Sequence, residues 1–287
     1  MRPDVSVVVP VRNGAQTLAA CLESLLASRY PAAKREILVV DNGSTDATAD
    51  ILRSFGGRVR VLSEARLGPA AARNCGLRAA GSTLLAMTDA DCVVDSGWLE
   101  AIVTPLAEVP VGIVGGRIRA QTPCNSIARF GERIHDHEAA ISVYRPPYVI
   151  TMNWASRRDV LERVQYFDEQ LQRNEDGDFS YRTDQAGYRL VYQPSAIVYH
   201  RNRDTLWKLF REGYLHGYHA VPLLRKHHQF LRRLGHRRIH VQSYRRLWED
   251  ALASWRQPGE SRYSFVFNLG KKLGKWHGSV RFRYVDL

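Results

Sequence analysis

Two aspartates one residue apart, Asp89 and Asp91, directly follow the apolar run 84–88. Such a run predicts a buried strand that delivers two carboxylates to the edge of a sheet. Neighbouring carboxylates repel each other and are costly to desolvate, so a cation is expected beside them. A hard divalent ion that takes its remaining ligands from water and a diphosphate fits this chemistry. The alternative is an ordinary helix cap after the strand, because Asp95 and Ser96 come shortly afterwards.

Alternating strands and helices are expected to position these carboxylates. The sequence predicts strands at 5–11, 36–40, 59–62, 84–88 and 196–200, and helices that begin near residues 17, 47 and 68. Thr45 or Asp46 is expected to cap the second helix. Strands that alternate with helices imply a parallel sheet whose ligand binds beyond the carboxyl ends of the strands. Asp41 and Asp89 both follow such ends, so the sequence predicts an acidic crevice of nucleotide size.

Six short motifs follow one another between about residues 4 and 200. They occupy residues 8–13, 41–46, 72–76, 88–91, 167–169 and 175–178. In this order and spacing they resemble the family 2 glycosyltransferases. The resemblance implies the α/β GT-A fold of nucleotide-diphospho-sugar transferases, a mostly parallel sheet flanked by helices. It also implies an inverting, metal-dependent transfer of a sugar from a nucleoside diphosphate to a hydroxyl group.

On the nucleotide side, the resemblance assigns five contacts. Pro10 and Asp41 would contact the nucleobase, with the Asp41 carboxylate accepting the imide N–H of a uracil-type base. Asn13 and Arg73 would contact the nucleotide, and Asp89 would lie near the ribose and the metal. Two alternatives stay open: Asp41 closes an Asx-turn between strand and helix, and Arg73 lies on a solvated helix face. UDP is favoured, dTDP presents the same imide edge, and GDP is not excluded.

The resemblance also implies a divalent metal, Mn²⁺ or Mg²⁺. Asp91 would bind it directly, and His200, at the end of its own apolar strand, would complete the site or touch the diphosphate. An imidazole ligand suits Mn²⁺ better than Mg²⁺. A structural role is the alternative for His200. The cluster at 135–138 contains two histidines and two acids but lacks zincin spacing, so it is not expected to bind metal.

Three acids, Glu175, Asp176 and Asp178, lie within four residues of one another. Transfer to a hydroxyl needs a carboxylate that takes its proton. By position in the motif Asp176 is the predicted base, with Asp178 and Glu175 as fallbacks. The alternative is that these acids begin a helix, where negative charge is favourable.

The acceptor side is assigned by resemblance to the segment that contains Asn153, Trp154 and Arg158. Trp154 and Trp98 could stack on a sugar ring, but an aromatic residue in this position is at least as often part of the core. The acceptor is expected to be a saccharide or a lipid-linked sugar, as in polysaccharide biosynthesis.

Composition predicts an intracellular enzyme with one sizeable domain and an appendage. The chain has 287 residues, of which 45% are hydrophobic, and four scattered cysteines that suit reduced thiols in a cytosol. Neither a signal peptide nor an apolar stretch of transmembrane length is visible, so a cytoplasmic location is expected. We expect a catalytic domain at 1–200, with a nucleotide-binding half at about 1–95 and an acceptor half at about 96–200.

Residues 201–287 carry the positive charge of the chain. They hold 19 Lys+Arg against 6 Asp+Glu, a balance of +13, whereas residues 1–200 balance to −1. This basic, mainly helical region is expected to present an apolar face through Trp207, Phe210 and Tyr214 until Pro222 ends the helix. Such a helix is typical of a peripheral contact with an anionic membrane surface on the cytoplasmic side. The alternative is a helix packed on the catalytic domain with a solvated cationic face.

Two other classes of protein fit less well. A nucleic-acid-binding protein would explain the isoelectric point near 9.8, but no recognised nucleic-acid motif is present, and Asp41, Asp89, Asp91 and Asp176 would have no role. A non-catalytic sugar-nucleotide binder is disfavoured by the complete acidic set. We therefore expect no nucleic-acid partner.

Overall fold

The computed structural model describes residues 2–236, 241–256 and 259–285. The chain divides into two compact units, which are described separately. The first unit comprises residues 1–121 and 135–200, and the second comprises residues 122–134 and 201–287.

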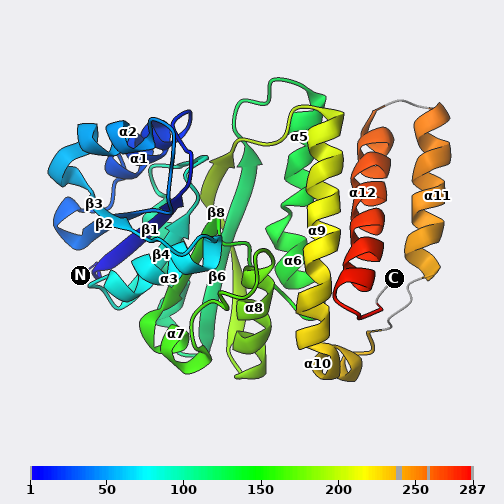
Figure 1. The fold of residues 1–287 in the computed structure, drawn as a ribbon. Coiled ribbons are helices and arrows are strands. Elements are labelled where there is room, and N and C mark those ends of the chain that lie inside the picture. Colours follow the sequence, from blue (N-terminus) through cyan, green and yellow to red (C-terminus); the bar gives the residue numbers. More distant parts are fainter. Residues whose placement is uncertain (1, 237–240, 257–258, 286–287) are drawn as a thin grey trace. The chain divides into compact units, whose positions relative to one another are not determined.

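An eight-stranded sheet forms the centre of the first unit (Figure 1). Its strands are β1 (Val5–Val11), β2 (Arg35–Asp41), β3 (Arg60–Ser63), β4 (Leu84–Thr88), β5 (Cys92–Val94), β6 (Val111–Ala120), β7 (Asn153–Arg157) and β8 (Arg189–His200). They lie in the order β3-β2-β1-β4-β7-β6-β8-β5. The β3-β2-β1-β4 portion is parallel, as alternating strands and helices predict. Strand β7 is antiparallel to β4 and β6, and β5 is antiparallel to β8.

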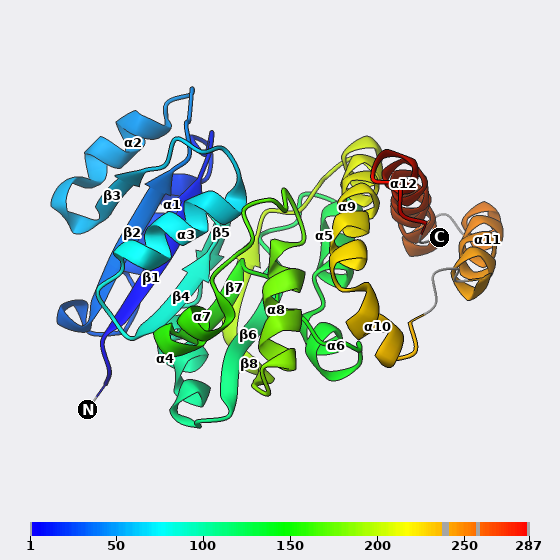
Figure 2. The ribbon, with the colours of Figure 1, turned by 60° about the horizontal axis from the view of Figure 1, so that its bottom comes forward.

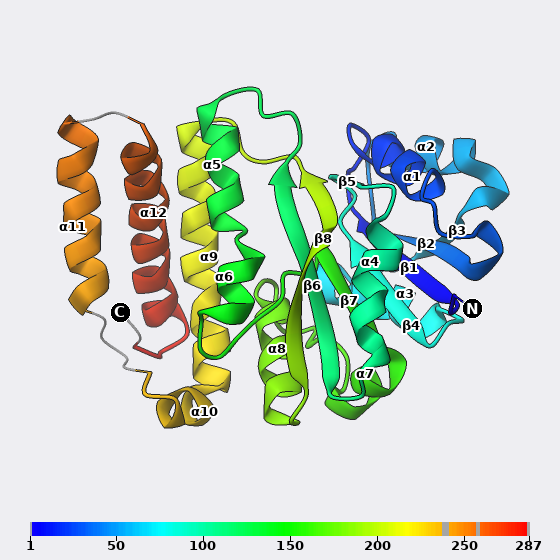
Figure 3. The ribbon, with the colours of Figure 1, turned by 180° about the vertical axis from the view of Figure 1, so that it is seen from behind.

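Helices cover both faces of this sheet because its central strands are apolar on both sides. The helices of the first unit are α1 (Leu18–Leu26), α2 (Thr48–Phe55), α3 (Pro69–Ala79), α4 (Trp98–Val103), α6 (His137–Ser142), α7 (Arg158–Val164) and α8 (Glu175–Gln185). Alternate residues of β1 enter opposite cores: Val7 and Val9 pack with α1, α2 and α4, whereas Val8 packs with α3, α7 and α8. In Figure 1 the second group of helices faces the viewer, and Figure 3 shows α1 and α4 from behind.

Five helices make up the described part of the second unit. They are α5 (Ser126–Ile134), α9 (Leu206–Lys226), α10 (His228–Arg233), α11 (Val241–Arg256) and α12 (Glu260–Arg281). Figure 2 shows α9, α12 and α11 side by side. The described residues contain no helix with enough length and apolar character to cross a membrane.

Glycines bring α9 and α12 into backbone contact. An ideal Cβ on Gly217 would lie 1.9 Å from the carbonyl oxygen of Lys271, and one on Gly274 would lie 1.9 Å from that of Tyr214. Real Cβ atoms cannot approach an oxygen so closely, so only glycine permits this packing. The Gly-x3-Gly spacing of both helices repeats once per turn and keeps the glycines on one face.

The structure corrects two expectations about α9. Pro222 does not end the helix, which continues to Lys226. Proline cannot donate a hydrogen bond to the Tyr218 carbonyl four residues earlier, but that carbonyl faces Gly278 of α12, where an ideal Cβ would come within 2.6 Å. The predicted apolar face of α9 is also not a single exposed surface. Leu209 and Val221 are buried, and the glycine side of the helix packs on α12.

Candidate active site

The loops that follow β1 and β2 are tied together by hydrogen bonds. Asn13 has a left-handed backbone with φ of 54°. Its N–H donates to Ser44 Oγ at 2.9 Å, and its side-chain oxygen accepts the N–H of Thr45 at 2.8 Å. The expected cap by Thr45 or Asp46 is wrong, because Ala47 is the N-cap of α2; Asp46 lies one residue earlier and accepts the N–H of Thr48 at 3.0 Å. Asn13 therefore links the loop after β1 to the loop after β2.

Pro10 and Asp41 lie at the carboxyl ends of their strands. The last residue pair between β1 and β4 is Val8 with Met87, and Pro10 lies beyond it. The missing N–H of Pro10 therefore removes no hydrogen bond between β1 and β4. One carboxylate oxygen of Asp41 accepts the N–H of Ser44 at 3.1 Å. The Asx-turn that the sequence left open is thus present. It leaves the second oxygen of this half-buried carboxylate for another donor.

Arg73, on α3, joins three parts of the site. Its side chain is only 6% exposed, which excludes the solvated helix face. It donates to Asp89 at 3.1 Å and forms an ion pair with Glu175. Desolvation alone would lower the pKa of Arg73, but the charges of Asp89 and Glu175 outweigh it and raise the pKa above its ordinary value. Its Nε is buried without a hydrogen-bond partner among the described residues.

The three acids at the start of α8 have different surroundings. Glu175 is buried against Arg73. Asp178 is fully buried and receives two hydrogen bonds from Arg182, at 2.7 and 2.9 Å. Asp176 accepts the N–H of Gly177 at 2.8 Å and keeps part of its surface accessible. Two of the three acids are therefore committed to structural ion pairs, and Asp176 is the one that differs.

The pKa of Asp176 is raised to about 7, mainly by burial and also by the neighbouring negative charge of Glu175, while the charge of Arg73 acts in the opposite direction. A carboxyl group whose pKa lies near neutrality is a stronger base than an ordinary aspartate. The environment of Asp176 is therefore typical of a catalytic carboxylate.

Strand pairing brings Asp91 and His200 together. Cys92 of β5 pairs with His200 of β8, and the His200 Nε2 lies 3.4 Å from Asp91 Oδ2. The ring of His135 lies edge-on to His200, with 5.1 Å between ring centroids. The described residues contain no group of three or more histidines, cysteines or acids suited to a metal. A carboxylate oxygen and an imidazole nitrogen that face each other fit an ion that completes its coordination from water and a diphosphate.

Asn153 and Trp154, assigned to the acceptor side, are instead part of the core, so this assignment is corrected. The side-chain oxygen of Asn153 accepts the indole N–H of Trp98 at 2.8 Å, and its amide donates to Arg117 and Ala196 carbonyls at 2.9 Å. Trp154 is 1% exposed and packs on the rings of two phenylalanines. A fully buried indole cannot stack on a sugar, and Trp98 is equally buried.

Arg158 is also occupied structurally. It donates to the carbonyls of Ala80 at 2.5 Å and Ser82 at 2.9 Å, just beyond the end of α3. Within the cluster at 135–138, one histidine is held by two backbone groups. His137 is buried between the Gly116 carbonyl and the Ile150 N–H, and desolvation lowers its pKa to about 4.

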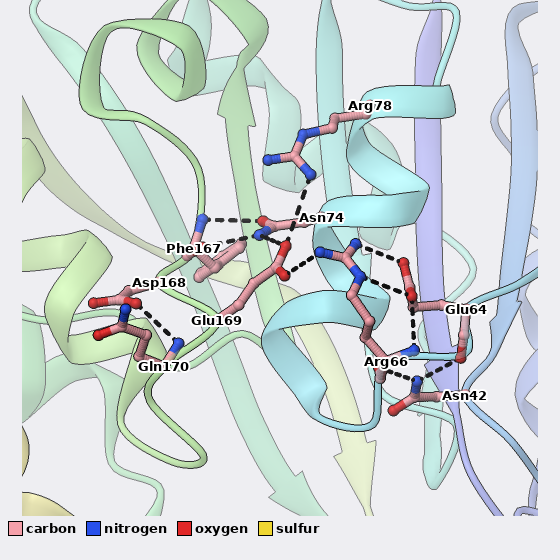
Figure 4. Close-up of polar contacts among 9 residues, drawn as sticks. All are labelled: Asn42, Glu64, Arg66, Asn74, Arg78, Phe167, Asp168, Glu169 and Gln170. Carbon is pink, nitrogen blue, oxygen red and sulfur yellow. Dashed lines mark hydrogen bonds and ion pairs between the residues drawn. The ribbon is translucent and has the colours of Figure 1, made fainter.

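Two asparagines have roles that the sequence did not indicate (Figure 4). Asn42 donates to the carbonyls of Glu64 and Arg66 and accepts the N–H of Gly68, each at 2.8 Å, which fixes the loop before α3. Asn74 exchanges hydrogen bonds with the backbone of Phe167 at 2.9 and 3.0 Å. Both asparagines lie next to a predicted site residue within a motif, and that position is the signal that could have revealed them.

An ion-pair network reinforces the same junction. Glu169 forms ion pairs with Arg66 at 2.5 Å and with Arg78 at 3.7 Å, and it also accepts a hydrogen bond from Asn74 at 2.9 Å. Arg66 is in turn paired with Glu64 at 2.8 Å. These contacts hold the 167–169 motif against α3 (Figure 4), so that motif positions the helix that carries Arg73.

Comparisons with known proteins agree with this geometry. A model of the family described as Glycosyl transferase family 2 matches residues 6–176. Glycosyltransferase AglE of Haloferax volcanii is 34% identical over 220 residues, which cover 74% of this chain and 72% of AglE. The pre-mycofactocin glycosyltransferase of Mycobacterium tuberculosis is 32% identical over 234 residues, covering 78% of this chain and 48% of that protein. The chain thus spans about half the length of the second relative.

Solved structures show the same fold. The mannosyltransferase PcManGT from Pyrobaculum calidifontis, in complex with GDP-Man and Mn²⁺, aligns with a TM-score of 0.68 and 21% identity over 97% of this chain and 87% of its own. Residues 1–349 of S. aureus TarS with UDP-GlcNAc align with a TM-score of 0.56 and 17% identity, over 98% of this chain and 92% of that one.

The strand order and the acidic sheet edge define a GT-A nucleotide-sugar transferase fold, which confirms the predicted fold class. The chain belongs to glycosyl transferase family 2, and it is a glycosyltransferase.

Proposed function

We propose that the protein is an inverting, metal-dependent glycosyltransferase that uses Asp176 as its single base. It would move a sugar from a nucleoside diphosphate to a hydroxyl of a saccharide or lipid-linked acceptor, in polysaccharide biosynthesis. The observation that carries this proposal is the different pairing of the α8 acids. Glu175 and Asp178 are neutralised by arginines, whereas Asp176 remains partly accessible with a raised pKa.

The donor would bind along the carboxyl ends of β1, β2 and β4. Pro10 and the second oxygen of Asp41 would contact the base, and Asn13 would shape the loop around it. Asp89 would lie near the ribose. Arg73 would contact the nucleotide while it holds Asp89 in place.

Asp91 and His200 would hold the metal, and Mn²⁺ is favoured because a nitrogen ligand is present. The ion would supply Lewis-acid stabilisation of the leaving nucleoside diphosphate. The protein's own part is positional: Arg73 keeps Asp89 and the start of α8 in a fixed arrangement. Arg73 would in this way link the start of α8, which carries the proposed base Asp176, to Asp89 beside the nucleotide.

Asp176 would accept the proton of the acceptor hydroxyl as that oxygen attacks the anomeric carbon from the face opposite the leaving group. The bond between the anomeric carbon and the phosphate oxygen breaks, and the electron pair leaves with the nucleoside diphosphate. One displacement by one base gives inversion at the anomeric carbon.

A direct experiment can identify the nucleobase of the donor. Asp41 favours UDP and accommodates dTDP, but one structural neighbour was solved with GDP-Man and another with UDP-GlcNAc. A thermal-shift screen of UDP, dTDP and GDP with Mn²⁺ would rank them, because a ligand that binds only the folded protein raises its melting temperature. Stabilisation by UDP or dTDP supports the role of Asp41, and stabilisation by GDP alone contradicts it.

The proposed division of labour assigns catalysis to residues 1–200, with a nucleotide half at about 1–95 and an acceptor half at about 96–200. The basic residues 201–287 form an appendage. Release of nucleoside diphosphate that depends on an added acceptor would support the proposed transfer. Nucleotide binding without any release would instead indicate a non-catalytic binder.

A further inference from the structure

Helix α11 carries a row of large apolar side chains that nothing in the described structure covers. Trp248, Leu252 and Trp255 are 67%, 45% and 93% exposed. They are separated by four and three residues, so they lie on one face of the helix. We call these three side chains the tryptophan face.

The side of α11 opposite the tryptophan face is fixed to α12 through Asp250, which accepts hydrogen bonds from Ser264 at 2.8 Å and Asn268 at 3.2 Å. Tyr244 lies one turn before Trp248 on the same face as the tryptophans, and it accepts the indole N–H of Trp276 at 2.7 Å. Trp276 is itself 48% exposed. The apolar surface therefore continues from α11 onto α12.

The exposed tryptophans and the positive charge around them indicate which kind of partner this surface binds. A contiguous exposed patch of this size marks an interaction site, and tryptophan is the side chain that favours the boundary between lipid and water. Arginines border the row, with Arg245 and Arg256 exposed on the same helix. The whole of 201–287 has a balance of +13, which complements a negatively charged lipid surface.

We propose that the tryptophan face of α11 docks on an anionic lipid bilayer, with its indole rings in the headgroup region and the helix lying along the surface. This inference goes beyond the proposed catalytic function and does not depend on it. It also replaces the sequence-based expectation, which placed the membrane-facing side chains on α9. The glycine side of that helix packs on α12 instead.

The test is sedimentation with vesicles of phosphatidylcholine and phosphatidylglycerol at equal parts, compared with pure phosphatidylcholine. The full chain should bind the anionic vesicles at low salt and bind less as salt is added, because the attraction is screened. The double variant Trp248→Ser/Trp255→Ser should lose binding by about tenfold or more, since each ring removes a large apolar surface from the contact.

Trp207→Ser is the matched control, because it removes a tryptophan that is 70% exposed on α9. It should leave binding unchanged. An equal loss of vesicle binding in the two variants would overturn the assignment to α11. Unchanged vesicle binding by the double variant would also overturn it. A double variant that abolishes a dimer in solution, with no vesicle binding by the wild type, would show that a second copy covers the face.

Tryptophan fluorescence of the wild-type protein provides a second test, which does not depend on the folding of the serine variant. Bromine-labelled lipids in the anionic vesicles should quench the fluorescence of wild-type tryptophan, and Trp248→Phe/Trp255→Phe should remove most of that quenching while keeping the protein bound. Quenching that persists in the phenylalanine variant would contradict the proposal.

Discussion

Replacing Asp176 and Asp178 separately by asparagine should change stability in opposite directions, although they lie two residues apart. Asp178 is fully buried and paired with Arg182 at 2.7 Å. Its removal leaves a guanidinium without its counter-charge, which typically costs about 3 kcal/mol or more. Asp176 has no such pair among the described residues, and its ionisation is disfavoured in the folded protein.

The magnitude for Asp176 follows from its pKa. Folding raises the pKa from 3.8 to about 7, so the folded protein holds this proton more tightly than the unfolded chain. The stability that protonation provides is complete at low pH and is lost as the pH rises from about 4 to about 7. At about 1.36 kcal/mol per pH unit the full effect would be about 4 kcal/mol. Partial exposure screens the charge, so we expect Asp176→Asn to stabilise by about 1–3 kcal/mol at pH 8.

Denaturant unfolding of the two variants and the wild type at pH 5 and pH 8 measures this effect. The gain from Asp176→Asn should be larger at pH 8 than at pH 5, while Asp178→Asn should be destabilising at both. If Asp176→Asn destabilises at pH 8, or if its effect is the same at both pH values, the carboxylate is not held in the environment described here.

Three further predictions use other parts of the molecule. The transfer rate should increase as the pH rises through about 7, because the base must be ionised; a rate that is already constant from pH 5 upward would argue against Asp176. Asp91→Ala should abolish the Mn²⁺-dependent part of nucleotide affinity in calorimetry while the circular dichroism spectrum is unchanged; unaltered Mn²⁺ dependence would remove Asp91 from the site. Gly274→Ala should destabilise the second unit by about 1–3 kcal/mol or more, because its Cβ would meet the Tyr214 carbonyl. Gly57→Ala, with open space at its Cβ, should be nearly neutral in the same melts.

Strands and helices that follow from the pattern of their own residues could be predicted from the sequence. The strand at 5–11 and the helix after residue 17 follow from β-branched runs and helical spacing, and the structure has them as β1 and α1. The positions of Asp41, Asp89 and Asp91 at strand ends could also be predicted. A carboxylate that follows a buried apolar run is expected at the carboxyl edge of a parallel sheet. The family assignment was confirmed by a family model that matches residues 6–176.

Long-range pairing could not be predicted. The pair of Asp178 with Arg182 is local, because the two residues lie four apart on α8, but the pairing of Glu175 with Arg73 from α3 depends on the fold. The burial of Trp154 depends on packing against α8, which is distant in the sequence.

The continuation of α9 past Pro222 depends on α12 in the same way. The regular glycines at 213, 217, 270, 274 and 278 were a readable signal for that helix pair. Their function became clear only when the two backbones were seen in contact.

The measurement that tests the central claim most directly is the transfer rate of Asp176→Asn under saturating donor, alongside its affinity for that donor. The account predicts nearly unchanged donor affinity and a loss of transfer on the order of 10²-fold or more, because a positioned base contributes about 10²–10⁴. If Asp176→Asn retains its transfer rate while Asp178→Asn binds donor normally and loses transfer, the base lies two residues along and the account is contradicted.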